Sequence, residues 1–209
     1  MSGDEKRERS YVIGQAVFSA RSLPPALYLV ATPIGNLADI TIRALETLAA
    51  ADVVACEDTR VSRVLLSRYG ISRRMTAYHE HNAAEAGPKL VAAVLAGKSV
   101  ALVSDAGTPL VSDPGYRLVE EVAAAGGAVV PIPGASALLA ALTASALPSD
   151  TFLFAGFLPA RAGQRKTRLD ELKAVPATMI FYESPRRLAE ALAAMADVLG
   201  DRPAAICRE

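Results

Sequence analysis

The chain has 209 residues, 52% of them apolar, with 22 basic and 22 acidic side chains. Because the net charge is zero, it gives no argument for binding to nucleic acid or membrane, and any polyanion site has to come from a local cluster. No stretch holds the roughly 18 consecutive apolar residues that a membrane span needs. Two cysteines far apart in the sequence fit a reducing cytoplasm better than a disulfide framework.

Short apolar runs alternate with helical patterns along the chain, which is typical of an α/β protein. The pattern changes at Leu147-Pro148-Ser149. We therefore predict a loosely ordered lead-in (1–22), an N-terminal α/β domain (23–147) and a C-terminal α/β domain (148–209). We expect strands at 27–31, 52–56, 75–78, 100–103, 128–132, 151–155, 177–182 and 204–207. Because the last strand has nothing after it, we expect the second domain to be incomplete.

Two expected strands in the first half lead into unusual polar loops. The first is followed by Thr32-Pro33-Ile34-Gly35-Asn36 and the second by Glu57-Asp58-Thr59-Arg60. On the helix after the second loop, Arg60, Arg63 and Ser67 share one face, and further basic residues follow at Arg68, Arg73 and Arg74. This stripe is either a solvated helix face or a functional surface, and the sequence leaves both interpretations open.

Both histidines of the chain lie in His79-Glu80-His81-Asn82, directly after the third expected strand. A zinc site would need further ligands at a recognisable spacing, and the sequence offers none, so we predict no metal. We expect Asn82 to cap the next helix and one histidine to face a cleft. The later Gly97-Lys98-Ser99 is not a phosphate-binding loop, because it follows a helix and Ala92 stands where that motif has its first glycine.

Residues 100–115 join a buried strand to a rigid loop that contains two glycines, two prolines and two aspartates. Ligands of open α/β sheets bind at the carboxyl ends of the strands, so we expect this loop to line a binding site. Gly107 would let the backbone approach a ligand closely. Asp105 either contacts the ligand or holds the loop, and we favour ligand contact. For Asp113 we favour a cap on the following helix.

A small-residue turn, Pro133-Gly134-Ala135-Ser136-Ala137, lies between a strand and a helix. It either offers backbone N–H groups to a ligand or serves tight packing. The chain contains no G-x-G-x-x-G motif, which argues against a dinucleotide-binding fold. The turn also lacks the final glycine of a G-x-S-x-G nucleophile elbow.

The second half carries one strongly basic segment, residues 161–173. It is the best candidate in the chain for contacts with phosphates, and a solvated surface is the alternative. Its basic residues are Arg161, Arg165, Lys166, Arg168 and Lys173.

Six motifs in this order resemble the bacterial ribosomal RNA small-subunit methyltransferase I family of the tetrapyrrole-methylase-like superfamily. They are residues 32–37, 57–60, 79–82, 104–115, 131–137 and 181–187, and the resemblance runs from about residue 27 to residue 209. It implies two α/β domains with a cofactor cleft between them, S-adenosylmethionine as cofactor, and a cytoplasmic homodimer. It also implies 2′-O-methylation of a cytidine in 16S rRNA of the small ribosomal subunit, and further strands after residue 209.

The resemblance, together with the loops above, assigns candidate roles to individual residues. Those expected to bind the cofactor are Pro33, Ile34, Gly35, Asp105, Gly107, Thr108, Pro109, Pro133, Gly134, Ser136, Ala137, Phe157 and Leu158. Those expected near the reacting nucleotide are Glu57, Asp58, Arg60, His79 and Asn82. Those expected to contact RNA are Arg63, Arg161, Arg165, Lys166, Arg168 and Arg187.

A ribose hydroxyl is a poor nucleophile, so a base that removes its proton would help methyl transfer. His79 and Glu57 are both candidates for this base. A small-molecule methylase of the tetrapyrrole type and a non-catalytic RNA-binding module are the alternative functions. The basic segment argues against the first, and the cleft loops with their acidic cluster argue against the second.

Overall fold

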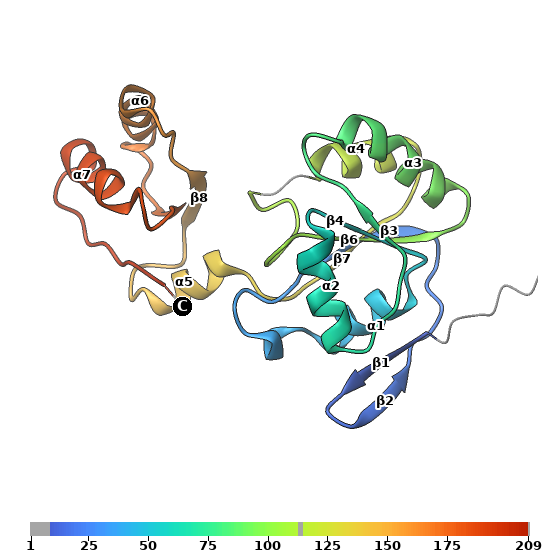
Figure 1. Cartoon of the computed structure of the whole chain (residues 1–209). Helices are drawn as coiled ribbons and strands as arrows, with labels where there is room; N and C mark the ends of the chain where they lie inside the picture. Colours follow the sequence, from blue (N-terminus) through green and yellow to red (C-terminus); the bar gives the residue numbers. More distant parts are fainter. Residues whose placement is uncertain (1–8, 113–114, 209) are drawn as a thin grey trace, which may run out of the picture. The chain divides into compact units, whose positions relative to one another are not determined.

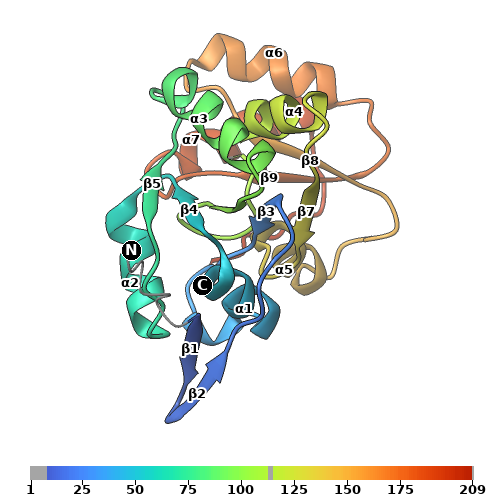
Figure 2. The same ribbon diagram turned by 90° about the vertical axis from the view of Figure 1, so that its right-hand side faces the viewer.

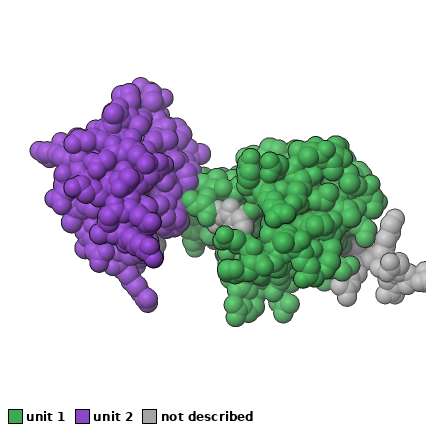
Figure 3. Space-filling model, turned by 90° about the horizontal axis from the view of Figure 1, so that it is seen from above, with its two compact units in different colours: residues 1–136 green, residues 137–209 purple. Residues whose placement is uncertain are grey.

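The computed structural model describes residues 9–112 and 115–208. The chain divides into two compact units, Met1–Ser136 and Ala137–Glu209 (Figure 3). The division lies before helix α5 (Ala137–Ala144), whereas the sequence pattern suggested a boundary after it. Within the second unit, the Cys207 thiol donates a hydrogen bond to the carbonyl of Ala141 in α5.

The first unit is built on a five-stranded sheet in the order β5-β4-β6-β3-β7, and every neighbouring pair is parallel. Its strands are β3 (Ala26–Val30), β4 (Val53–Cys56), β5 (Met75–Ala77), β6 (Ser99–Val103) and β7 (Val129–Ile132). They are joined by a 3-10 turn, η1 (Leu37–Asp39), and by helices α1 (Ile42–Ala50), α2 (Thr59–Arg68), α3 (Ala83–Leu95) and α4 (Tyr116–Ala124). The strands expected in this unit from their continuous apolar runs are therefore confirmed.

Helices cover both faces of this sheet, and side chains alternate between the two faces along each strand. In β3, Tyr28 and Val30 pack with α1 and α2, whereas Leu27 packs with α3 and α4. Figures 1 and 2 show α1 and α2 on one side of the sheet and α3 and α4 on the other. With both faces buried, the edges of the sheet are where a binding site can form.

The expectation of a loosely ordered lead-in is wrong for residues 10–19. These residues form an antiparallel hairpin of β1 (Ser10–Ile13) and β2 (Ala16–Ser19). Tyr11 is buried against the α1 side of the core, and the Val12 N–H donates to the Tyr69 carbonyl at 2.8 Å. Residues 1–8 of the predicted lead-in lie outside the described part of the chain.

The second unit holds a parallel pair, β8 (Phe152–Phe157) and β9 (Thr178–Tyr182), with helices α6 (Ala162–Leu172) and α7 (Leu188–Leu199). Leu158, Leu169 and Val198 form the centre of its core. The strand expected at 204–207 is absent: this segment is exposed and pairs with no described strand.

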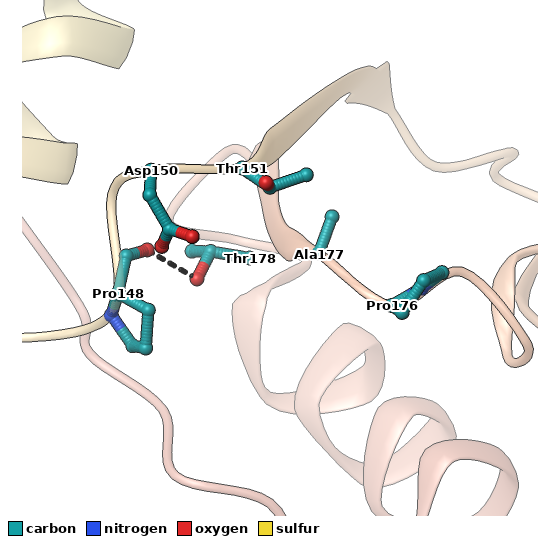
Figure 4. A pocket seen from close by; sticks show the side chains of 6 residues that line it. All are labelled: Pro148, Asp150, Thr151, Pro176, Ala177 and Thr178. Carbon is teal, nitrogen blue, oxygen red and sulfur yellow. Dashed lines mark hydrogen bonds between the residues drawn. The ribbon is translucent and has the colours of Figure 1, made fainter.

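The second unit has an open pocket at the amino ends of β8 and β9, shown in Figure 4. There the Thr178 hydroxyl donates to the Pro148 carbonyl at 2.6 Å. No residue that we predicted to be functional lines this pocket, whose walls are Pro148, Asp150, Thr151, Pro176, Ala177 and Thr178.

Asp52, just before β4, connects the amino ends of two central strands. Its Oδ2 accepts from the backbone N–H and hydroxyl of Ser99, both at 2.8 Å, and its Oδ1 accepts from Arg9 at 2.9 Å. Burial raises the pKa of this carboxyl, but the bonds from Ser99 and the charge of Arg9 together hold it below the ordinary value of 3.8.

We predict that Asp52→Asn lowers the free energy of unfolding by about 1–2 kcal/mol at pH 7, because it weakens charge-assisted bonds. The folded-state pKa is depressed, so the wild-type advantage is present above about pH 4 and is lost as pH falls through the folded pKa. Urea unfolding at pH 7 and pH 3 measures this, with the exposed Asp39→Asn as control. An equal difference from wild type at both pH values would contradict the prediction.

Candidate active site at the carboxyl edge of the parallel sheet

The polar loops singled out in the first half of the sequence all lie at one edge of the first unit. Because the sheet is wholly parallel, the segments that follow β3, β4, β5, β6 and β7 leave from the same edge. The helix after β3 covers one face of the sheet and the helix after β6 covers the other. The boundary between β3 and β6 is therefore a topological switch point, the usual ligand site of open α/β sheets.

Backbone hydrogen bonds connect the two loops at this switch point. The Thr32 N–H donates to the Gly107 carbonyl at 2.8 Å, and the Gly107 N–H donates to the Thr32 carbonyl at 3.1 Å. The buried Thr32 hydroxyl donates to the Ser104 carbonyl at 3.3 Å, and the Ser104 hydroxyl donates to Gly107. We did not predict roles for Thr32 and Ser104. The sequence feature that could have identified these two residues is their position directly after buried apolar strands.

Two glycines bring the backbone of these loops close to neighbouring segments. Gly107 has a φ of +80°, and a Cβ there would lie 3.2 Å from the Ile34 side chain. A Cβ on Gly134 would lie 2.9 Å from that of Ala31. The Thr108 hydroxyl donates to the Ala135 carbonyl at 3.2 Å, which connects the loop after β6 to the loop after β7. The three loops thus approach one another closely, and the two glycines leave room for that approach.

The loop after β6 is also conformationally strained. Leu110 and Ser112 have φ values of +72° and +66°, which side chains other than glycine rarely adopt. Such residues cost of order 1–3 kcal/mol each and cluster at ligand-binding and catalytic sites. Asp113, the expected helix cap, lies outside the described residues, and Gly115 occupies the cap position of α4.

The loops after β4 and β6 meet through two aspartates. The exposed Asp105 accepts a hydrogen bond from the Asp58 N–H at 3.1 Å. Asp58 caps α2 by accepting from the Arg60 N–H at 2.8 Å, and it pairs with the Arg60 guanidinium at 2.6 Å. The bonds from the Arg60 side chain and backbone lower the pKa of Asp58 to about 2. The carboxylate is therefore charged throughout the physiological range. Glu57, directly before it, is half-buried.

Asn82 does not cap α3 with its side chain as we expected. Its side-chain oxygen accepts from the His79 N–H at 2.8 Å, and its amide donates to the Ala77 carbonyl at 2.9 Å. Asn82 therefore fixes the loop that carries His79. The His79 ring lies 6.1 Å from that of His81, and its buried Nδ1 has no hydrogen-bond partner among the described residues.

The remaining cofactor candidates lie in the second unit. Phe157 is exposed at the carboxyl end of β8 and makes an edge-on contact with Tyr182, whereas Leu158 is buried. Arg187 donates to the Leu158 carbonyl and pairs with Glu183 at 3.2 Å. Ala137 is the first residue of α5.

The basic segment of the second unit forms helix α6. Arg161, Lys166 and Arg168 are exposed, and Arg168 pairs with Glu171. Arg165 differs from the expectation of a surface phosphate ligand. It is 6% exposed, donates to the Ala160 carbonyl and pairs with Glu190 at 3.5 Å. It packs there because it shares the inward face of α6 with buried Leu169 and Leu172.

Among residues 9–112 and 115–208, no helix is long and apolar enough to cross a membrane. The same residues contain no group of three or more His, Cys, Asp or Glu side chains that could hold a metal ion.

The fold is that of the class III, tetrapyrrole-methylase-like methyltransferases, and the family model agrees. Residues 26–209 match the family model described as Tetrapyrrole (Corrin/Porphyrin) Methylases. Among solved structures, cobalt precorrin-4 methyltransferase has a TM-score of 0.63 at 19% identity, covering 83% of this chain and 74% of its own. Diphthine synthase has a TM-score of 0.62 at 19% identity, and the match covers 82% of this chain and 74% of the synthase. At these identities the likeness concerns the fold alone.

Curated relatives narrow the assignment. A protein named ribosomal RNA small subunit methyltransferase I from Mesorhizobium japonicum is 76% identical over 199 residues, 95% of this chain and 68% of its own length. A protein of the same name from Halalkalibacterium halodurans is 50% identical over 195 residues, which make up 93% of this chain and 68% of that protein. The chain thus spans about two thirds of the length of these relatives. It belongs to the ribosomal RNA small subunit methyltransferase I family, within the tetrapyrrole methylases.

The chain is therefore a methyltransferase, and its family uses S-adenosylmethionine, whose sulfonium supplies an activated methyl group. The carboxyl edge fits such a group. Gly107 and Gly134 leave backbone where a side chain would crowd its neighbours, and Asp105 presents an exposed carboxylate beside them.

We predict that Gly107→Ala weakens S-adenosylmethionine binding and lowers the free energy of unfolding by about 1–2 kcal/mol, because alanine is disfavoured at positive φ. Gly97→Ala is a matched control. Gly97 has a φ of +87° but has nothing within 4 Å of an added Cβ. Thermal unfolding and calorimetric titration of both variants separate strain from binding. Equal cofactor affinities for the two variants would count against Gly107 as part of the site.

Proposed function

We propose that the protein transfers a methyl group from S-adenosylmethionine to the ribose 2′-hydroxyl of a cytidine in 16S rRNA. The observation that carries the proposal is the meeting of three features at one sheet edge. These are the backbone-bridged loops at the β3–β6 switch point, the Asp58–Asp105 contact, and the His79 loop. The names of the curated relatives support small-subunit rRNA as the substrate.

In this proposal the cofactor binds the loops after the central strands. Asp105 accepts hydrogen bonds from the ribose hydroxyls or the amino group of the cofactor, since only its Oδ1 is bonded within the described residues. The backbone around Gly107 and Gly134 contacts the rest of the molecule. The other contributing residues are Pro33, Ile34, Gly35, Thr108, Pro109, Pro133 and Ser136, with Ala137, Phe157 and Leu158 from the second unit.

Methyl transfer from a sulfonium needs little covalent help, so in-line positioning of the two reactants supplies most of the rate. Asn82 holds the His79 loop, and Asp58 fixes the first turn of α2 through Arg60. His79 and Glu57 remain the two candidates for the base that accepts the hydroxyl proton. Such a base typically contributes 10²–10⁴-fold.

On the RNA side, four exposed cations and the half-buried Arg187 are the proposed phosphate ligands. Arg63 lies on α2 and Arg187 lies beside Leu158, while Arg161, Lys166 and Arg168 lie at or on α6. We further propose that the protein is a cytoplasmic homodimer that acts on the small ribosomal subunit.

The function is tested by methyl transfer from labelled S-adenosylmethionine to small ribosomal subunits and to 16S rRNA alone, followed by mapping of the modified nucleotide. Label on the 2′-oxygen of one cytidine is the expected result. Label on a nucleobase would contradict methylation of the ribose 2′-hydroxyl. If a tetrapyrrole offered in a parallel reaction is labelled and neither RNA acceptor is, the alternative function is favoured.

We predict that Asp105→Asn weakens S-adenosylmethionine binding about 10- to 100-fold, because a charge-assisted hydrogen bond is worth roughly 1.5–3 kcal/mol. Asparagine can still accept the Asp58 N–H, so the contact between the two loops is kept. Isothermal titration calorimetry measures the affinity, and an unchanged value would exclude Asp105 as a cofactor ligand.

A separate prediction concerns α6. Replacing the exposed Arg161 and Lys166 with alanine should weaken RNA binding. It should also make the slope of log affinity against log salt concentration shallower by roughly 0.7 per lost phosphate contact. Arg165→Ala should instead lower the thermal stability, because it leaves Glu190 without its partner and removes packing. Fluorescence anisotropy over a salt series and thermal melts distinguish these effects. If Arg165→Ala melts like wild type, the structural role that we assign to it is wrong.

A further inference from the structure

The first unit has a second hollow, formed by the end of α2 and the segment that leads to β5. We refer to it as the α2 groove, with a volume of about 530 Å³. It combines two arginines and two serines with an apolar base, and it is separate from the carboxyl-edge loops. Its lining residues are Arg63, Leu66, Ser67, Gly70, Ile71, Ser72, Arg73 and Met75.

This region carries an unusual local charge for a chain whose net charge is zero. Residues 59–79 contain five arginines and no acidic residue. The Arg63 side chain is exposed and has no ion pair or hydrogen bond within the described residues. Elsewhere in the first unit, Arg9, Lys89 and Arg117 each pair with a carboxylate. The unpaired Arg63 at the rim of the α2 groove is suited to an anionic ligand.

Arg73, which also lines the groove, is held in place. Its Nε donates to the carbonyl of Ala49, near the end of α1. Fixing the guanidinium lowers the entropy that is lost when it binds a ligand. The exposed Ser67 and Ser72 also line the groove and add hydroxyl donors. Together these groups offer several donors to phosphate oxygens.

The groove is connected to the carboxyl edge by one face of α2. The helix begins at Asp58, where the loops after β4 and β6 meet. Arg60, Arg63 and Ser67 follow at the i, i+3 and i+7 positions, so they share one face. Ten residues of helix cover about 15 Å. A nucleic-acid strand that binds along this face would therefore have one part in the groove and another at the carboxyl edge.

We propose that the α2 groove binds a backbone phosphate of the RNA substrate, on the same strand as the nucleotide that is methylated at the carboxyl edge. The proposal rests on the proposed function and adds a specific contact to it. RNA fits better than an acidic protein segment, because the cationic face leads directly to the edge at which a nucleotide would react.

The test compares three variants of the protein. Arg63→Ala removes the proposed contact, Arg63→Lys keeps its charge, and Lys89→Ala removes one positive charge from the exposed surface of α3, across the sheet. The affinities of labelled single-stranded RNA and of small ribosomal subunits are measured over 50–200 mM salt. Cofactor affinity and melting temperature are measured beside them.

We expect Arg63→Ala to bind RNA about fivefold more weakly at 0.1 M salt. The slope of log affinity against log salt concentration should become shallower by roughly 0.7, the value for one phosphate contact. Arg63→Lys should recover most of the loss, and Lys89→Ala should match wild type. Cofactor affinity and melting temperature should not change in any variant.

Three other outcomes overturn the proposal. If Arg63→Ala and Lys89→Ala bind RNA equally, the groove makes no phosphate contact. If Arg63→Ala loses affinity for subunits but not for RNA, the groove binds a protein. If the wild-type protein neither binds nor methylates RNA, the proposed function fails as well, which distinguishes that failure from the first two.

Discussion

The parallel pairing of β3 with β6 is the constraint on which the site depends. The register from Ala26↔Ser99 to Leu29↔Leu102 places the ends of both strands side by side. Thr32 and Gly107 can then exchange two backbone hydrogen bonds just beyond the sheet. A shift of one residue would exchange the two faces of the strand and move its core side chains to the wrong side. The pairing of these two strands thus fixes the position of two loops.

Electrostatic contacts organise the neighbouring loops in the same way. Asp58 accepts from Arg60 and donates its own N–H to Asp105, so one residue orients α2 and positions the carboxylate after β6. Because Arg60 is already paired with Asp58, its charge is locally balanced. Arg63, one turn further along α2, has no such partner within the described residues. Neutral and cationic regions therefore follow each other along a single helix.

The sequence predicted the buried strands of the first unit well, because a strand covered on both faces appears as a continuous apolar run. It did not reveal the β1–β2 hairpin, although Gly14, with a φ of +62°, gives the two-residue turn that such hairpins need. Composition also could not show which cation of α6 faces inward. The spacing of Arg165 with Leu169 and Leu172 would have shown it. The role of Asn82 depended on a loop conformation that no short-range pattern specifies.

The central claim is that the loops at the carboxyl edge of the β3–β6 pair bind S-adenosylmethionine. Amide hydrogen exchange with and without the cofactor tests it most directly, because it reports on each backbone segment separately. We predict slower exchange in the bound state over residues 34–36, 105–109 and 134–136, with little change in the β1–β2 hairpin. Cofactor binding that leaves exchange in all three loops unchanged would contradict the account.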